Sequence, residues 1–157
     1  MAPQMNEPVK EQSRELPYEP PSKTPELLNP IVLAYAGDAV FELLVRQHLL
    51  AQPNLKPHHL HREATGMVSA KGQRQLLERW APMLSEEEAD IVRRGRNAKS
   101  GQSPRNADPA DYKQATALES LMGYLYYKGR TERIRELMAA AFSEKEAERG
   151  KETGNGQ

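Results

Sequence analysis

The sequence predicts an all-α fold, a single domain of about five to seven helices. Apolar residues recur at helical spacing in five segments, and none of these segments shows the sustained alternation of a β-strand. Proline, glycine and capping residues separate the segments, so most helices have a recognisable start or end. The chain has 157 residues, which is enough for one domain with a hydrophobic core.

The two ends of the chain differ from its middle in composition. Residues 1–28 hold six of the twelve prolines, many charges and few apolar side chains. Such a segment buries too little apolar surface to offset its ordering entropy, so we expect a disordered N-terminal tail. The helical domain is expected over residues 29–143. Residues 144–157 are charged and contain glycine, and we expect a disordered C-terminal tail there.

The overall composition excludes several classes of protein. The 22 basic and 22 acidic residues balance, so a polyanionic partner must be held by a local patch. The absence of cysteine excludes disulfides, thiolate metal sites and cysteine nucleophiles. The N-terminus lacks the apolar core of a signal peptide, and the apolar run at residues 31–45 is too short to span a bilayer. We therefore expect a soluble, cytoplasmic protein.

The longest apolar run, residues 30–50, predicts the first helix. Asn29 is a suitable cap, and Pro30 suits the first helical position. Apolar residues cover most of its circumference, so we expect burial on nearly every side. An ionised Asp38 in such surroundings needs a partner, because removing water from a charge is costly. Asp38 either holds a metal ion or is a structural residue paired with a basic group or the backbone.

Four further helices follow, each with an apolar face. They are expected over residues 57–79 with an interruption near Gly66 or Gly72, from Ser85 to near Gly95, over residues 110–128, and from Thr131 onward. The start at Ser85 is the best defined, because three glutamates follow it in a capping-box pattern.

The fourth of these five helices carries a second unusual acid, Glu119, flanked by leucines. Gly37 precedes Asp38, and Gly123 follows Glu119 by one turn. Small residues let helix backbones approach closely, which would bring the two carboxylates within reach of one cation. Two facing carboxylates repel unless a proton or cation lies between them. Oxygen ligands favour Mg²⁺ or Mn²⁺ over zinc.

A basic stretch precedes the helix of Glu119. Residues 91–107 contain no acid and five cationic side chains, namely Arg93, Arg94, Arg96, Lys99 and Arg105. We predict that this stretch grips the phosphates of a nucleic acid, with Asn97 as a groove-reading amide; a solvated basic loop is the alternative. Such binding would weaken steeply with salt.

Four segments, in order, resemble the ribonuclease III catalytic domain and, in detail, its smaller Mini-ribonuclease III branch. They are Ala34-Tyr35-Ala36-Gly37-Asp38-Ala39, Val68-Ser69-Ala70-Lys71-Gly72-Gln73, Arg93-Arg94-Gly95-Arg96-Asn97-Ala98-Lys99 and Ala115-Thr116-Ala117-Leu118-Glu119. The resemblance covers roughly residues 26–142. It implies a helical ribonuclease III-like domain without a separate double-stranded-RNA-binding domain.

The resemblance also implies a function. Members of this branch are homodimeric, Mg²⁺-dependent endoribonucleases that cut double-stranded RNA, and in bacteria the branch is associated with maturation of large-subunit (23S) ribosomal RNA. Precursor ribosomal RNA is then the expected substrate, and a ribosomal protein on that substrate is a further candidate partner. The first helix is too apolar for a small monomer to hide, which independently favours a dimer.

The catalytic residues and metal ligands expected from this resemblance are Asp38 and Glu119. Larger relatives usually carry further acids where this chain has Ala34 and Thr116, so water and RNA phosphate would complete the coordination. A metal ion there would activate water, shield the scissile phosphate and stabilise the leaving oxygen. Glu42 and Thr116 are candidates for indirect support, although a salt bridge from Glu42 to Arg46 is the alternative.

The full set of predicted RNA contacts joins the basic stretch to polar residues elsewhere. It comprises His61, Lys71, Gln73, Arg74, Arg93, Arg94, Arg96, Asn97, Lys99 and Tyr112. The histidines at 58, 59 and 61 form a surface cluster or, alternatively, a metal site without a nearby acid. His48 is expected to pack. Three further tyrosines on the fourth helix, at 124, 126 and 127, are more typical of core or interface.

Two other functions are compatible with parts of this pattern. A non-catalytic helical RNA-binding module would share the basic stretch and keep the two acids as structural residues. An all-α phosphohydrolase of small nucleotides would also need a metal, but that class generally brings more His and Asp ligands together. Mg²⁺-dependent cleavage of a plain RNA duplex distinguishes the nuclease from both.

Overall fold

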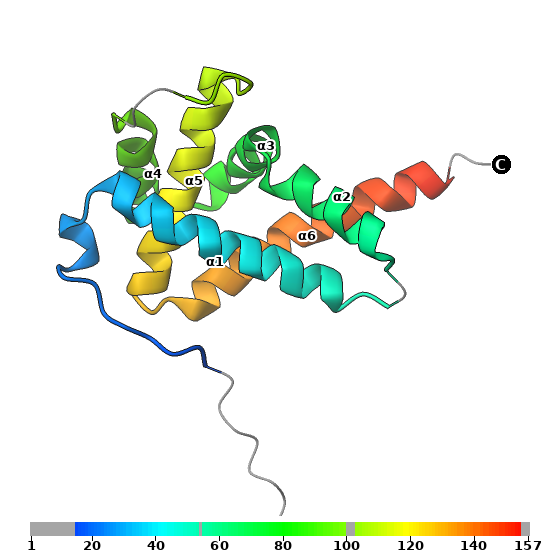
Figure 1. Cartoon of the computed structure of the whole chain (residues 1–157), viewed down its shortest axis with the longest axis horizontal. Helices are drawn as coiled ribbons and strands as arrows, with labels where there is room; N and C mark the ends of the chain where they lie inside the picture. The colour runs from blue at the N-terminus through cyan, green and yellow to red at the C-terminus, as the bar shows by residue number, and fades with distance from the viewer. Residues whose placement is uncertain (1–14, 54, 100–102, 155–157) are drawn as a thin grey trace, which may run out of the picture.

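The chain is helical throughout its regular structure (Figure 1). The computed structural model describes the backbone of residues 15–53, 55–99 and 103–154, and side chains up to residue 143. Its elements in order are η1 (Pro25–Leu27), α1 (Pro30–Leu50), α2 (Pro57–Val68), α3 (Ala70–Trp80), η2 (Ala81–Met83), α4 (Glu86–Asn97), α5 (Pro109–Tyr127) and α6 (Thr131–Gly154). These segments contain no strand, which confirms the all-α prediction. None of their helices is long and apolar enough to cross a membrane.

The helix starts have side-chain caps, at Asn29 and Ser85 as predicted and also at Asp108. Asn29 and Asp108 each accept a hydrogen bond from the amide two residues further on, at 2.8 and 2.7 Å. Ser85 Oγ accepts from the Glu88 amide at 3.1 Å, and Glu88 Oε1 accepts from the Ser85 amide at 2.8 Å. The capping box predicted at Ser85 is confirmed, and α4 continues past the expected end near Gly95 to Asn97.

The predicted helix over residues 57–79 is two helices, α2 and α3. The break falls at Ser69, between the two glycines where an interruption was expected. Ser69 Oγ accepts from the Gly72 amide at 3.0 Å and so caps α3. A Cβ added at Gly72 would overlap the carbonyl oxygen of Gly66, so this glycine lets the first turn of α3 sit on the end of α2.

Helix α5 is the centre of the domain. It lies between α3 and α4, α1 crosses it, and α6 packs against its C-terminal half (Figure 1). A Cβ added at Gly37 would overlap the backbone of Glu119, and one added at Gly123 would overlap the backbone of Leu33. The close approach of the two helices expected from these glycines is therefore confirmed.

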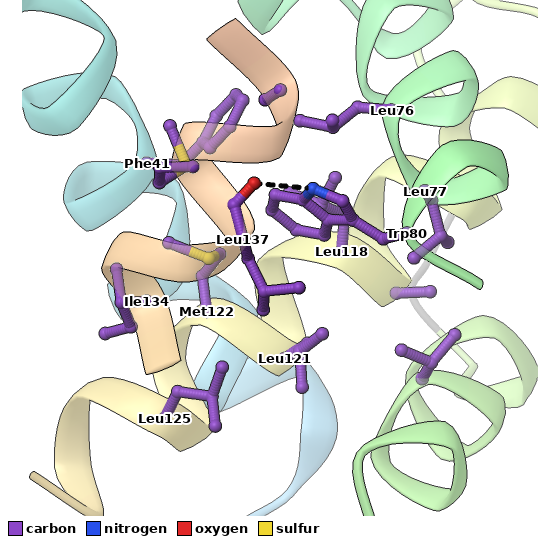
Figure 2. Packing of buried hydrophobic residues seen from close by; sticks show 14 of the residues in the cluster. Phe41, Leu76, Leu77, Trp80, Leu118, Leu121, Met122, Leu125, Ile134 and Leu137 are labelled. Atoms are coloured by element: carbon purple, nitrogen blue, oxygen red, sulfur yellow. Dashed lines mark hydrogen bonds between the residues drawn. The ribbon is translucent and has the colours of Figure 1, made fainter. Parts of the chain in front are cut away.

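The hydrophobic core lies where α5 meets α1, α3 and α6 (Figure 2). Trp80 is fully buried there, and its Nε1 donates a hydrogen bond to the carbonyl oxygen of Leu137 at 2.8 Å. Other core side chains surround it, among them Phe41, Leu76, Leu77, Leu118, Leu121, Met122, Leu125 and Ile134. Core side chains of α1, α3 and α6 therefore fix the position of α5, the helix that carries Glu119.

The expectation that α1 is buried on nearly every side is wrong for this chain on its own. Its inner face is buried, at Leu33, Ala34, Gly37, Phe41, Val45 and Leu49. Its outer face leaves Tyr35 87% and Leu50 72% exposed, and Val32 and Leu43 are also exposed. The pattern of apolar residues did not reveal that the rest of the chain covers only one side of the helix.

The segment before α1 contacts the domain, although it was expected to belong to the N-terminal tail. The Tyr18 ring lies against Tyr126 and Tyr127, with centroids 6.0 and 6.3 Å apart. Leu28 is 9% exposed and belongs to the core cluster. Residues 1–14 of that predicted tail lie outside the described residues.

Helix α6 follows α5 after a short turn and extends further than the expected domain. Gly129, at φ +70°, ends α5 in a turn in which its amide donates to Tyr126 O and the Arg130 amide donates to Leu125 O, both at 3.0 Å. Helix α6 then begins at Thr131, as predicted, and continues to Gly154. The sequence between residues 144 and 151 is rich in good helix formers, which explains the extension past residue 143.

One nearly buried ion pair fixes α6 to α4. The Glu88 side chain is 3% exposed and accepts from Arg133 Nε at 2.9 Å and Arg133 Nη2 at 2.8 Å. The hydrogen bonds from Arg133 hold the pKa of Glu88 below its usual range, against the effect of burial. Arg133 also donates to Met83 O at 2.7 Å, so one guanidinium joins three parts of the chain.

We predict that Arg133→Met lowers the free energy of unfolding by about 3 kcal/mol, because it leaves the Glu88 carboxylate buried without its cation. Urea denaturation at pH 7 measures the change. Arg135→Met is the control, since Arg135 pairs with Glu132 on the surface, and it should change stability by no more than about 0.5 kcal/mol. Equal losses in the two variants would contradict the prediction.

Candidate functional site

Asp38 and Glu119 meet where α1 crosses α5. The residue before Asp38, Gly37, packs directly against the Glu119 backbone. Burial and, after it, the charge of Asp38 raise the pKa of the Glu119 carboxyl, so the two acids lie within electrostatic reach. The structure therefore brings together the two acids that the sequence singled out, and it does so through the contact made by the helix glycines.

The two acids differ in exposure: the expected burial of Asp38 is wrong, whereas Glu119 is partly buried, as its flanking leucines indicated. Asp38 is exposed, whereas Glu119 is partly buried between α1, α3 and α5. Within the described segments, no ion pair or hydrogen bond of the Asp38 side chain is found. The alternative of a structural aspartate paired with an arginine therefore has no support there. Asp38 therefore lies on the solvent side of the site, and Glu119 lies on its inner side.

The electrostatics of Glu119 are those of a crowded anionic site. Burial raises its pKa to about 7, and the negative charges of Asp38 and, more weakly, Glu42 act in the same direction. The amide of Gln73 opposes the shift by donating a hydrogen bond to Glu119 Oε1 at 3.1 Å. A proton or a cation at this position relieves the repulsion.

The residues present fit a hard divalent cation. The donors are carboxylate oxygens, which suit Mg²⁺ or Mn²⁺. No group of three or more His, Cys, Asp or Glu side chains gathers as a metal site among the described residues. A cation here would take two protein carboxylates and complete its coordination with water or substrate oxygens, as Mg²⁺ often does.

Gln73 occupies a different place from the one expected. The residue is 2% exposed, and its Nε2 donates to Val68 O at 2.9 Å as well as to Glu119. The predicted direct contact with RNA does not fit this burial. The sequence signal was present, because Gln73 closes the second motif, but the motif alone did not show which way the side chain points.

The two residues expected to support the ligands indirectly make local contacts. Thr116 is buried, and its hydroxyl donates to Tyr112 O at 3.0 Å within α5. Glu42 forms an ion pair with Arg46 at 3.6 Å, which confirms the alternative stated for it. Glu42 nevertheless stays close enough for its charge to act on Glu119.

A cleft of about 440 Å³ lies where the end of α4 meets the start of α1. It is lined by Asn29, Pro30, Arg93, Arg94, Asn97, Ala98 and Lys99. Ser120, the residue after Glu119, connects the cleft to α5, since its hydroxyl lies 2.9 Å from Pro30 O. Four of the ten predicted RNA contacts, Arg93, Arg94, Asn97 and Lys99, therefore gather on one surface. Arg93 is also paired with Asp90.

The other predicted contacts are distributed over α2, α3, α4 and α5. His61 and Lys71 are exposed, and Tyr112 is half-buried in the first turn of α5. Arg96 is half-buried on α4. Arg74 forms ion pairs with Glu78, at 2.8 Å, and with Asp111, so its charge is largely compensated.

The other histidines and tyrosines that the sequence singled out make ring contacts or hydrogen bonds with neighbouring side chains. His58 and His59 are exposed with ring centroids 4.1 Å apart, outside any cluster of three metal ligands in the described segments. His48 stacks on Phe142 with centroids 3.6 Å apart, which confirms the expected packing role. Tyr124 is buried and donates to Glu87.

Comparisons with known proteins agree with this arrangement. The family model described as Ribonuclease III domain matches residues 31–130. A Mini-ribonuclease 3 of Brevibacillus brevis is 50% identical over 127 residues, which cover 81% of this chain and 95% of the relative. One from Symbiobacterium thermophilum is 46% identical over 117 residues, covering 74% and 90%. The crystal structure of a Fusobacterium nucleatum protein matches with a TM-score of 0.70 at 30% identity, covering 79% of this chain and 99% of that one.

We predict that Glu119→Gln stabilises the metal-free protein at pH 8 but not at pH 5. The folded chain keeps the Glu119 proton up to a pKa of about 7, whereas the unfolded chain loses it near the ordinary value. Native stability from this group therefore falls as the pH rises between these pKa values and stays lowered above them. Thermal and urea denaturation in chelator should show a gain of roughly 2 kcal/mol at pH 8. An equal gain at both pH values would contradict the prediction.

Proposed function

This chain belongs to the Mini-ribonuclease III branch of the ribonuclease III family and is an endoribonuclease, and we propose that it cleaves double-stranded RNA with a divalent metal ion held by Asp38 and Glu119. The observation that carries the proposal is the meeting of these two acids at the α1–α5 crossing; a basic cleft lies nearby, where the end of α4 meets the start of α1. Mg²⁺ is the cation proposed, with Mn²⁺ as a substitute.

The two acids would have different roles in the site. Glu119 is held from inside by the Gln73 amide, so its position is set before RNA binds. Asp38 is exposed, so an RNA phosphate can approach it without rearrangement of the chain. When bound, the metal ion supplies positive charge for the scissile phosphate and the leaving oxygen and increases the acidity of the attacking water.

The basic cleft is proposed to hold the RNA backbone beside this site. Arg94, Asn97 and Lys99 line it together with the first residues of α1. Cationic side chains bind phosphates whatever the base sequence, so this surface recognises the shape of a duplex. His61, Lys71 and Tyr112 are proposed as further contacts, and Gln73 is not, because it is buried.

We propose that the active form is a homodimer formed through the outer face of α1. Val32, Tyr35, Leu43 and Leu50 are spaced to share one face of this helix and are all exposed. The exposed Arg46 lies on the same face and interrupts this apolar strip. Apolar side chains gathered in this way mark an interaction surface, and a second copy of the same helix would cover it symmetrically. Asp38 lies at the edge of this face, so two sites would lie near one interface and act on one duplex.

The substrate proposed is a precursor of large-subunit ribosomal RNA, processed in the cytoplasm. The proposal is supported by the motif resemblance to the Mini-ribonuclease III branch, and by relatives of that name that align over most of this chain. A ribosomal protein bound to the precursor is a candidate partner that would shape the RNA before cleavage.

We predict that Asp38→Asn reduces Mg²⁺-dependent cleavage of a plain RNA duplex by roughly a thousand-fold or more, because it removes one of two charged ligands. The melting temperature should stay within a degree or two of wild type, since Asp38 is exposed. Gel assays with Mg²⁺ and with chelator measure the effect. Glu132→Gln, at an exposed acid on α6, is the matched control with near-normal activity. Normal turnover of Asp38→Asn at saturating Mg²⁺ would overturn the proposal.

We predict that Leu43→Lys converts the dimer to a monomer, because it places a charge in the middle of the apolar strip on α1. Sedimentation equilibrium at micromolar protein measures the change in mass. Gln75→Lys, an exposed change on α3, should leave the mass of the dimer unchanged. A wild-type protein that sediments as a monomer would contradict the proposed interface.

A further inference from the structure

Gln73 joins three helices next to the candidate metal ligand. Its side chain leaves the first turn of α3, and its Nε2 lies 2.9 Å from Val68 O, at the end of α2, and 3.1 Å from Glu119 Oε1, on α5. The residue is 2% exposed, so solvent does not compete for these bonds. Both amide hydrogens are therefore committed, one to a helix end and one to the carboxylate.

The orientation of this amide is fixed by its neighbours. Val68 O is one of the last carbonyls of α2, and no amide of the same helix is placed to donate to it. A carbonyl can only accept a hydrogen bond, so the nitrogen of Gln73, and not its oxygen, must face Val68. The same nitrogen then donates to Glu119 Oε1 and leaves the other carboxylate oxygen for a cation.

The local sequence is arranged to deliver this contact. Ser69 caps α3 and separates it from α2, and Gly72 lets the first turn of α3 pack on the end of α2. Gln73 follows directly and is therefore directed along the end of α2 toward α5. A Cβ at Gly72 would push this turn away from Val68, so both hydrogen bonds depend on the glycine.

The arrangement is not optimal for stability alone. Gln73 Oε1 is buried and has no hydrogen-bond partner among the described residues, and an unsatisfied buried acceptor lowers stability. An apolar side chain of the same length would fill the space without this cost. The hydrogen bond from Gln73 Nε2 to Glu119 Oε1 explains why a glutamine occupies this position.

We propose that Gln73 is a positioning residue that presets Glu119 for metal binding, and that it makes no contact with RNA. This inference rests on the proposed function of Asp38 and Glu119 as metal ligands. Partners that orient a metal ligand typically change metal affinity by about 10–100-fold when they are removed. The expected defect therefore lies in metal binding and not in duplex binding.

The test compares Gln73→Met with wild type in three measurements. Calorimetric titration with Mn²⁺ should show an affinity at least about tenfold weaker. The Mg²⁺ concentration for half-maximal duplex cleavage should rise by a similar factor, while the rate at saturating Mg²⁺ stays within a few-fold of wild type. Binding of an RNA duplex in chelator should be unchanged. Gln75→Met, exposed on the same helix, is the matched control and should match wild type throughout.

The outcomes separate this inference from the proposed function. Wild-type Mn²⁺ affinity in Gln73→Met overturns the positioning role, and so does a loss of duplex binding in chelator, which would mean a direct contact with RNA. Gln73→Asn, too short to span both acceptors, gives the same readouts if the Met variant does not fold. If wild type itself binds no Mn²⁺ and cleaves no duplex, the proposed function fails.

Discussion

The functional site depends on the backbone contact between α1 and α5. Gly37 and Gly123 lie in the middle of long helices, where each costs about 1 kcal/mol relative to alanine. A side chain at either position would overlap the backbone of the opposite helix. This contact brings the residue after Gly37, Asp38, within electrostatic reach of Glu119. The two glycines therefore lower the stability of each helix, and they allow two like charges to lie close together.

The two acids have different supports because they come from different sides of the fold. Glu119 projects from the most buried helix of the domain and receives a hydrogen bond from Gln73, so its position is set by the core. Asp38 lies on a helix with one covered and one open side, and it stays exposed. In the metal-free protein the buried acid is destabilising when ionised, which its raised pKa expresses. A bound cation would reverse that penalty, so metal binding and stability are linked through the same carboxylate.

Whether a feature could be predicted from the sequence depends on how far apart in the chain the interacting residues lie. The starts at Asn29, Ser85 and Asp108 were predictable, because a cap involves residues two or three positions apart. The pairing of Asp38 with Glu119 was predictable from glycines and motif resemblance together. The exposed side of α1 and the burial of Gln73 were not, because both depend on which distant elements cover a surface. The Glu88–Arg133 pair, 45 residues apart, is of the same kind.

The two sides of α1 connect the site to the proposed dimer. The inner side packs against α5 and sets the distance between the acids, and the outer side is an apolar strip for which the chain provides no cover in its described residues. Asp38 lies where these two sides meet, since it follows the buried Gly37 by one residue and precedes the exposed Leu43 by little more than one turn. A second copy packed on the strip would restrict α1 from outside and shield the edge of the site from solvent. Association would then rigidify the one ligand that the core of a single chain leaves without support.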